Sequence, residues 1–95
     1  MDRPSIKIRF DSKLQKEIDK IKHKDPKLFK KIQKQLKQFK LNPKLKSLRV
    51  HKLSGELDNI WSISITKSIR MAYLQSGDEA YFYDLGTHDQ VYREK

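Results

Sequence analysis

Residues 60–74 read IWSISITKSIRMAYL, and the arrangement of their large apolar side chains decides the fold. Apolar and small polar residues alternate on both sides of Thr66-Lys67-Ser68, which is typical of two half-buried strands joined by a tight turn. A three-residue turn brings the large apolar side chains to one face, in the pairs Ile65–Ile69, Ile63–Met71 and Trp61–Tyr73. A two-residue turn would expose part of that apolar area, at about 25 cal/mol per Å². We therefore predict antiparallel strands at 60–65 and 69–74, with Arg70 on the opposite face beside Ser64, near Ser62 and Ala72.

The region before this hairpin has the spacing of two amphipathic helices. Leu14, Ile18 and Ile21 form one apolar stripe, and Ser12 with Gln15 resembles a capping box that starts the helix. Asp25-Pro26 predicts a second start, because aspartate caps helices and proline suits the first helical position. A second apolar stripe runs to Phe39, and Asn42-Pro43 predicts its end.

Two further strands complete the predicted sheet. Ser5–Phe10 alternates in polarity, and Glu79–Leu85 has aromatic residues on both faces, as an inner strand would; Ser76-Gly77 predicts the turn before it and Gly86 its end. We expect Lys44–Asn59 to be mostly loop, with at most a short helical turn. The prediction is an α+β fold, in which a helical hairpin packs on one face of a small, mostly antiparallel four-stranded sheet (β-α-α-β-β-β) and leaves the Arg70 face uncovered. We expect residues 1–95 to form a single domain.

Composition narrows the possible functions. The chain has no cysteine, which excludes disulfides and thiol catalysis, and its three glycines are isolated, so there is no glycine-rich phosphate loop. No pair of histidines or carboxylates has helical metal-ligand spacing, so we expect no metal and no cofactor. No apolar run approaches the length of about 20 residues that a membrane helix needs, and no secretory signal is apparent. We therefore expect a cytoplasmic protein without a membrane partner.

Charge is distributed very unevenly along the chain. Residues 1–52 contain 18 basic and five acidic residues, whereas residues 53–95 contain four basic and seven acidic residues. A field of this kind attracts polyanions, of which nucleic acid is the most common. The sequence therefore favours binding to nucleic acid or to an acidic protein, although a merely solvated lysine-rich helix surface would have the same composition.

One set of residues contains the groups that RNA cleavage requires. The ribose 2′-hydroxyl attacks the adjacent phosphate, so the reaction needs a base, an acid and a cation but no metal. His51 and His88 can transfer protons near neutral pH, Arg70 offers a planar fork of donors to phosphate, and Tyr92 can stack on a base or assist proton transfer. We expect further phosphates to be held by basic side chains, namely Lys46, Arg49, Lys52, Lys30 and Lys34.

The ordered set of motifs over residues 51–92 resembles the RelE/ParE superfamily of bacterial and archaeal toxins. The motifs are His51–Gly55, Ile60–Ile63, Ile69–Tyr73, Leu85–Asp89 and Val91-Tyr92. The resemblance implies a RelE-like fold and a ribonuclease that cuts messenger RNA in the ribosomal A site and is held inactive by a cognate antitoxin. It also implies that Arg70 stabilises the cleaved phosphate, that His88 is the general acid, that His51 is the base and that Tyr92 is an active-site aromatic.

Two other functions remain open at this point. The ParE branch shares the fold but inhibits DNA gyrase and generally lacks the histidine set, so His51, Arg70 and His88 together favour the ribonuclease branch. A non-catalytic RNA-binding module would use only the basic surface. Lys67 and Ser68 stand where one subgroup has an acidic-aromatic pair, which leaves the acid and base roles open.

Overall fold

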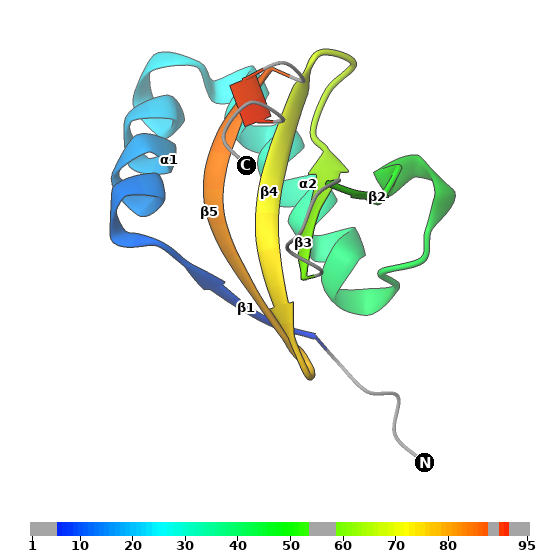
Figure 1. The fold of residues 1–95 in the computed structure, drawn as a ribbon. Helices are drawn as coiled ribbons and strands as arrows, with labels where there is room; N and C mark the ends of the chain where they lie inside the picture. The colour runs from blue at the N-terminus through cyan, green and yellow to red at the C-terminus, as the bar shows by residue number, and fades with distance from the viewer. Residues whose placement is uncertain (1–5, 54–58, 88–89, 92–95) are drawn as a thin grey trace.

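Two helices pack against a five-stranded sheet in the computed structural model, which describes residues 6–53, 59–87 and 90–91 (Figure 1). The strand order is β1-β5-β4-β3-β2, with β1 parallel to β5 and all other neighbours antiparallel. The elements in chain order are β1 Lys7–Phe10, α1 Ser12–Lys24, α2 Pro26–Leu41, the 3-10 helix η1 Lys46–Leu48, β2 His51–Lys52, β3 Ile60–Ser64, β4 Ile69–Ser76 and β5 Glu79–Thr87. The predicted α+β architecture is confirmed.

The β3–β4 hairpin has the predicted register. Trp61 lies opposite Tyr73, Ile63 opposite Met71 and Ser64 opposite Arg70. The Ile65 N–H donates to the Ile69 carbonyl at 2.8 Å, and the Thr66 hydroxyl oxygen accepts from the backbone of Ser68 and Ile69, which closes the three-residue turn. The apolar side chains of both strands therefore share the face that the helices cover.

The helices start where short polar side chains cap them. Asp11, rather than Ser12, caps α1, because its carboxylate accepts from the backbone N–H groups of Lys13 and Leu14. The predicted start of α1 is therefore corrected by one residue. Asp25 caps α2 as predicted, accepting from the Leu28 N–H with Pro26 in the first turn.

The main core lies between the helical hairpin and one face of the sheet. Leu14 and Ile18 of α1 and Ile32 and Phe39 of α2 are buried against the strands. The Phe39 ring meets the Tyr73 ring edge-on at 5.0 Å and the Phe82 ring at 5.6 Å, which are favourable arrangements for aromatic pairs. This cluster joins both helices to β4 and β5.

Three predictions about the sheet were wrong in detail. The sheet has five strands rather than four, because His51 and Lys52 pair with β3 in the region predicted to be loop. β5 continues through Gly86 to Thr87, because β4 extends far enough to pair with both. The turn before β5 is Gly77-Asp78, in which Gly77 has a φ of +59°, a conformation that favours glycine.

The face that carries Arg70 is partly covered, although the sequence predicted it to be open. A second, smaller cluster of Leu53, Ile60, Ala72 and Val91 lies there, with Tyr83 packed against it. Leu53 and Val91 come from segments without a periodic pattern, so the sequence did not indicate this cluster. In the described residues, no helix is long and apolar enough to cross a membrane.

We expect alkaline pH to destabilise the protein through Tyr73, which is 3% exposed. Burial raises the pKa of Tyr73 to about 12. In the unfolded chain this tyrosine loses its proton near its ordinary pKa of about 10, so the stabilisation is complete below pH 10 and is lost as the pH rises towards 12. Between pH 9 and 11.5 the unfolding free energy should fall by about 2 kcal/mol more in the wild type than in Tyr73→Phe. Denaturant titrations measure the difference, and equal losses in the two proteins would contradict it.

Candidate functional site

The centre of the candidate site is Arg70, which projects from β4 on the face away from the helices. Its Nε donates to the Ser62 hydroxyl at 2.8 Å, and its Nη2 donates to the Arg49 carbonyl at 2.6 Å and to the Ser62 carbonyl at 3.3 Å. These contacts come from β3 and from the segment between η1 and β2. The guanidinium is therefore held at a fixed orientation on a partly exposed surface.

The Arg49 carbonyl is brought to Arg70 by an unusual backbone conformation. Arg49 ends η1 in the left-handed region, with φ 48° and ψ 51°, and its N–H donates to the Lys46 carbonyl. A non-glycine residue rarely takes this conformation. Leu48, which is fully buried, anchors the turn by packing into the main core. The backbone conformation and the bond to Arg70 thus support each other.

His51 lies on the same face as Arg70. In β2 it pairs with Ser62, the residue whose hydroxyl and carbonyl both accept from Arg70. Directly paired residues share a face, with Cβ atoms about 5 Å apart. His51 and Arg70 are therefore neighbours of one serine, and the imidazole is exposed to solvent. This places a group that can transfer protons beside a group that can bind phosphate.

The other predicted basic residues divide between the two sides of the sheet. Lys46 and Arg49, at the start and end of η1, are exposed, and the Arg49 carbonyl accepts from Arg70. Lys52 lies on the helix-covered face, with its Nζ 5.8 Å from the centre of the Trp61 ring. Lys30 and Lys34 are exposed on α2, which lies on the far side of the sheet from Arg70 (Figure 1). The structure therefore does not gather the five predicted phosphate contacts into one surface.

His88 and Tyr92 lie outside the described residues. Of the residues on either side of His88, Thr87 pairs with Ile69 at the end of β5, and its N–H donates to the Gln90 side chain at 2.8 Å. The Gln90 N–H donates back to the Thr87 hydroxyl at 3.2 Å. Gly86 allows this close approach, because a Cβ there would lie 2.6 Å from the Gln90 Oε1 atom.

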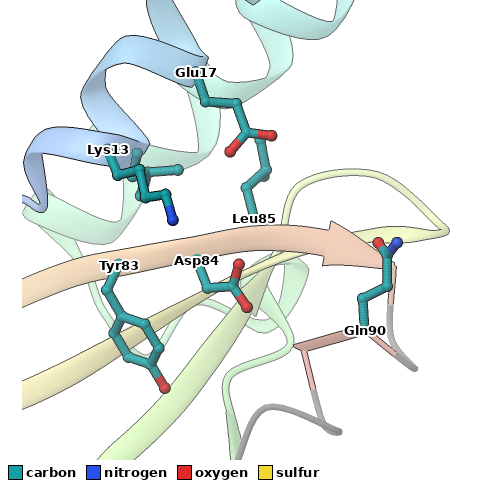
Figure 2. A pocket seen from close by; sticks show the side chains of 7 residues that line it. Lys13, Glu17, Tyr83, Asp84, Leu85 and Gln90 are labelled. Carbon is teal, nitrogen blue, oxygen red and sulfur yellow. The ribbon is translucent and has the colours of Figure 1, made fainter.

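A recess of about 520 Å³ lies beside this segment, between α1 and the second half of β5 (Figure 2). Its polar lining contains both signs of charge, with Lys13 and Glu17 from α1 and Asp84 from β5. Figure 2 also shows Gln90 at one end of the recess and Tyr83 along the strand. Arg70 and His51 are not among the lining residues, although Asp84 lies opposite Ala72, two residues along β4 from Arg70.

Gln35 supports the site from the other side of the sheet, and we did not predict this residue. It is buried in α2, and its Nε2 donates to the Ser64 carbonyl at 2.7 Å and to the Ser47 carbonyl at 3.3 Å. It therefore connects α2 to the end of β3 and to η1, two residues before Arg49. A sequence signal existed, because Gln35 occupies a position on the apolar stripe between Ile32 and Phe39.

Metal ligands do not gather in the described part of the chain. Within residues 6–53, 59–87 and 90–91, no group of three or more His, Asp or Glu side chains could hold a metal ion.

Comparisons with known proteins identify the fold. A YoeB/ParE toxin from Agrobacterium tumefaciens has a TM-score of 0.72 at 20% identity, over 87% of this chain and 99% of that chain. The YoeB-YefM complex from Staphylococcus aureus has a TM-score of 0.71 at 21% identity, over 87% of this chain and 97% of that chain. The E. coli DinJ-YafQ toxin-antitoxin complex has a TM-score of 0.70 at 16% identity, over 93% of this chain and 98% of that chain.

No family model matches the chain, and no curated protein matches it. The structural likeness confirms the RelE-like toxin fold that the sequence motifs implied.

We expect Gln35→Met to destabilise the protein by about 1–3 kcal/mol, because two partly buried carbonyls, those of Ser47 and Ser64, lose their donor while side-chain volume is nearly kept. Gln33→Met on the exposed side of the same helix is the control and should change stability by less than about 0.5 kcal/mol. Chemical denaturation measures both. In an NMR spectrum, only Gln35→Met should shift the Arg49 amide; equal stability of the two variants would rule out this role for Gln35.

Proposed function

We propose that this chain is the toxin of a type II toxin–antitoxin pair and that it cleaves messenger RNA on the ribosome. The observation that carries the proposal is the Arg70 guanidinium, fixed by Ser62 and Arg49 on the same sheet face as His51. A cation held in place before the substrate arrives stabilises the charge that develops on a phosphate without first having to reorganise. The RelE-like fold and the basic N-terminal half are consistent with this role.

In the proposed reaction the ribose 2′-hydroxyl attacks the adjacent phosphorus atom. His51 takes the proton of that hydroxyl, and Arg70 donates to the phosphate oxygens as negative charge builds on them. The bond from phosphorus to the 5′-oxygen breaks, and His88 protonates the leaving oxygen. The products are a 2′,3′-cyclic phosphate and a free 5′-hydroxyl, so no oxidant, metal or water is consumed. Tyr92 is proposed to stack on a neighbouring base.

The separated basic surfaces suggest two kinds of contact with RNA. Arg49, whose carbonyl accepts from Arg70, and Lys46, one turn before it, are exposed and would hold phosphates that flank the cut. Lys30 and Lys34 lie on the far side of the sheet, on α2, and would meet ribosomal RNA. Contacts on two sides suit a protein that sits between messenger and ribosome. Lys52, at the Trp61 ring, is the least suited of the five to bind the cut strand.

The proposed partner in the resting cell is a cognate antitoxin. The structural neighbours include complexes of YoeB with YefM and of DinJ with YafQ, and both pairs are described as toxin-antitoxin complexes. A chain with a net charge of +10 also needs an acidic partner to suppress non-specific binding to RNA. We place the protein in the cytoplasm, where messenger RNA and ribosomes are found.

We expect Arg70→Ala to lower the rate of messenger cleavage by about 10²–10³-fold, because charge on the phosphate loses its stabilising donor. Arg70→Lys should restore only part of the rate, since an ammonium lacks the planar fork. Cleavage of A-site messenger on purified translating ribosomes measures the rates. Arg9→Ala is the control, because it removes the same charge from an exposed side chain on β1, one that forms an ion pair with Glu79.

Two results would contradict the proposal. One is cleavage by a folded Arg70→Ala variant at the wild-type rate, with folding checked by circular dichroism. The other is inhibition of gyrase supercoiling by a protein that cleaves no RNA, which would assign the chain to the ParE type of activity.

A further inference from the structure

The recess between α1 and β5 lies where β5 has lost its neighbour on one side. β1 pairs with β5 only as far as Phe82, whereas β4 pairs with it as far as Thr87. Among the described residues, no strand follows β1 along that side, and α1 forms the opposite wall of the recess instead (Figure 2). Its volume of about 520 Å³ is within the range of about 300–1,000 Å³ that small-ligand sites have.

The recess adjoins the face of the sheet that carries Arg70. Asp84, which lines the recess, lies opposite Ala72, and Gly86 lies opposite Arg70. Paired residues share a face, so Asp84 and Arg70 are diagonal neighbours, about 7–8 Å apart. Gln90, which also lines the recess, lies over Gly86, with its Oε1 atom 2.6 Å from the place that a Cβ there would take. A nucleotide whose phosphate is held by Arg70 can therefore extend its base into the recess.

The Gln90 side chain presents a hydrogen-bond donor of fixed orientation. Its Oε1 atom accepts from the Thr87 N–H at 2.8 Å, and its backbone N–H donates to the Thr87 hydroxyl at 3.2 Å. Only the oxygen of an amide side chain accepts, so this bond determines which end of the amide carries the hydrogens. The two Nε2 hydrogens remain for another acceptor.

The charges in the recess are those of a site for a base rather than for a phosphate. Glu17 and Asp84 contribute two carboxylates, against the single ammonium of Lys13. This local excess of negative charge repels phosphate, although the whole chain has a net charge of +10. A nucleobase is uncharged and has both donors and acceptors on its edge, which suits a lining with carboxylates on one side and N–H groups on the other.

Guanine fits this set of groups best among the four bases of RNA. Its N1–H and N2–H donors lie side by side and match the two oxygens of one carboxylate, and its O6 atom, next to them, accepts from an amide or an ammonium. Adenine and cytosine place a ring-nitrogen lone pair beside their amino group, and uracil has a carbonyl on each side of its N–H. Each of these three bases would therefore turn an acceptor towards the carboxylate.

We propose that the recess is a base-binding subsite that selects guanine in a nucleotide attached to the cleaved phosphate. Asp84 accepts from N1–H and N2–H, and the Gln90 Nε2 donates to O6. The assignment rests on the proposed function, because it takes the phosphate at Arg70 to be that of RNA. It adds a preference in sequence to a reaction that otherwise involves only the ribose and the phosphate.

Binding of the four nucleoside 3′,5′-bisphosphates tests the subsite. Each probe carries phosphate on both sides of the ribose, so the test does not depend on which side of the cut the guanine lies. In NMR titrations the guanosine probe should bind about tenfold or more tightly than the other three and should shift the amides of 83–85 and of Gln90. Arg70→Ala should weaken all four probes alike and keep the preference, since Arg70 contacts only phosphate.

Two variants test the base contacts. Gln90→Glu keeps an acceptor for the Thr87 N–H but loses the donor to O6, and Asp84→Asn turns an N–H group towards the guanine donors. Each should reduce the preference for guanosine over adenosine to about twofold or less. The ratio of the two affinities is the readout, because a change of charge alters the binding of all four probes alike.

Asp19→Asn is the matched control, because it removes the same charge from an exposed residue of α1 outside the recess, and it should keep the preference. Circular dichroism checks the fold of each variant. If Asp84→Asn does not fold, Gln90→Glu decides alone, since Gln90 is exposed.

The subsite and the proposed function can fail separately, because the binding of these probes requires neither ribosomes nor cleavage. A chain that prefers the guanosine probe but cleaves no RNA keeps the subsite and loses the nuclease assignment. A chain that cleaves messenger on ribosomes but binds the four probes equally loses the subsite alone. The subsite is also overturned if the guanosine probe shifts the amides of Lys30 and Lys34 on α2 and leaves those of the recess unchanged.

Discussion

The period of two along the β3–β4 hairpin is the constraint on which the rest of the molecule depends. Because Ile63 and Met71 must lie beneath the helices, the alternating positions, Ser62 and Arg70, must lie on the other face. A shift of one residue would bury the guanidinium in the aromatic core and expose the apolar side chains. Burial of apolar side chains on one face of the sheet therefore fixes the position of the Arg70 guanidinium on the other face, although the guanidinium does not contact them.

The orientation of that cation depends on a second layer of contacts, which link distant parts of the chain. Gln35 joins α2 to β3 and to η1, and Leu48 anchors η1 in the core. Arg49 follows with its backbone in the left-handed region and presents its carbonyl to Arg70. Loss of the Gln35 amide or of the Arg49 carbonyl would leave a polar atom without its hydrogen-bond partner, and loss of the Leu48 side chain would detach η1 from the core. The site is thus built by the same elements that close the core.

Local pattern was enough to predict the elements with a clear period, including the hairpin register, the helical hairpin and the Asp25-Pro26 start. It was not enough for β2, because two residues have no measurable period and His51 and Lys52 are in a strand only through pairing with β3. The cover formed by Leu53 and Val91 was missed for the same reason, since isolated apolar residues in irregular segments indicate no partner. Of the predicted catalytic set, Arg70 and His51 come together at Ser62, and the positions of His88 and Tyr92 stay a prediction.

The parallel pairing of β1 with β5 has a consequence for synthesis. Residues 7–10 meet residues 79–82, so the first strand of the sheet finds its neighbour only after about 70 further residues have been made. The helical hairpin, held by local contacts, can form much earlier, whereas closing so long a loop is the slow step of assembly. During synthesis the residues of α1 and α2 are therefore available to pack on each other before those of β5 exist, and the sheet can close only once residues 79–82 have joined β1.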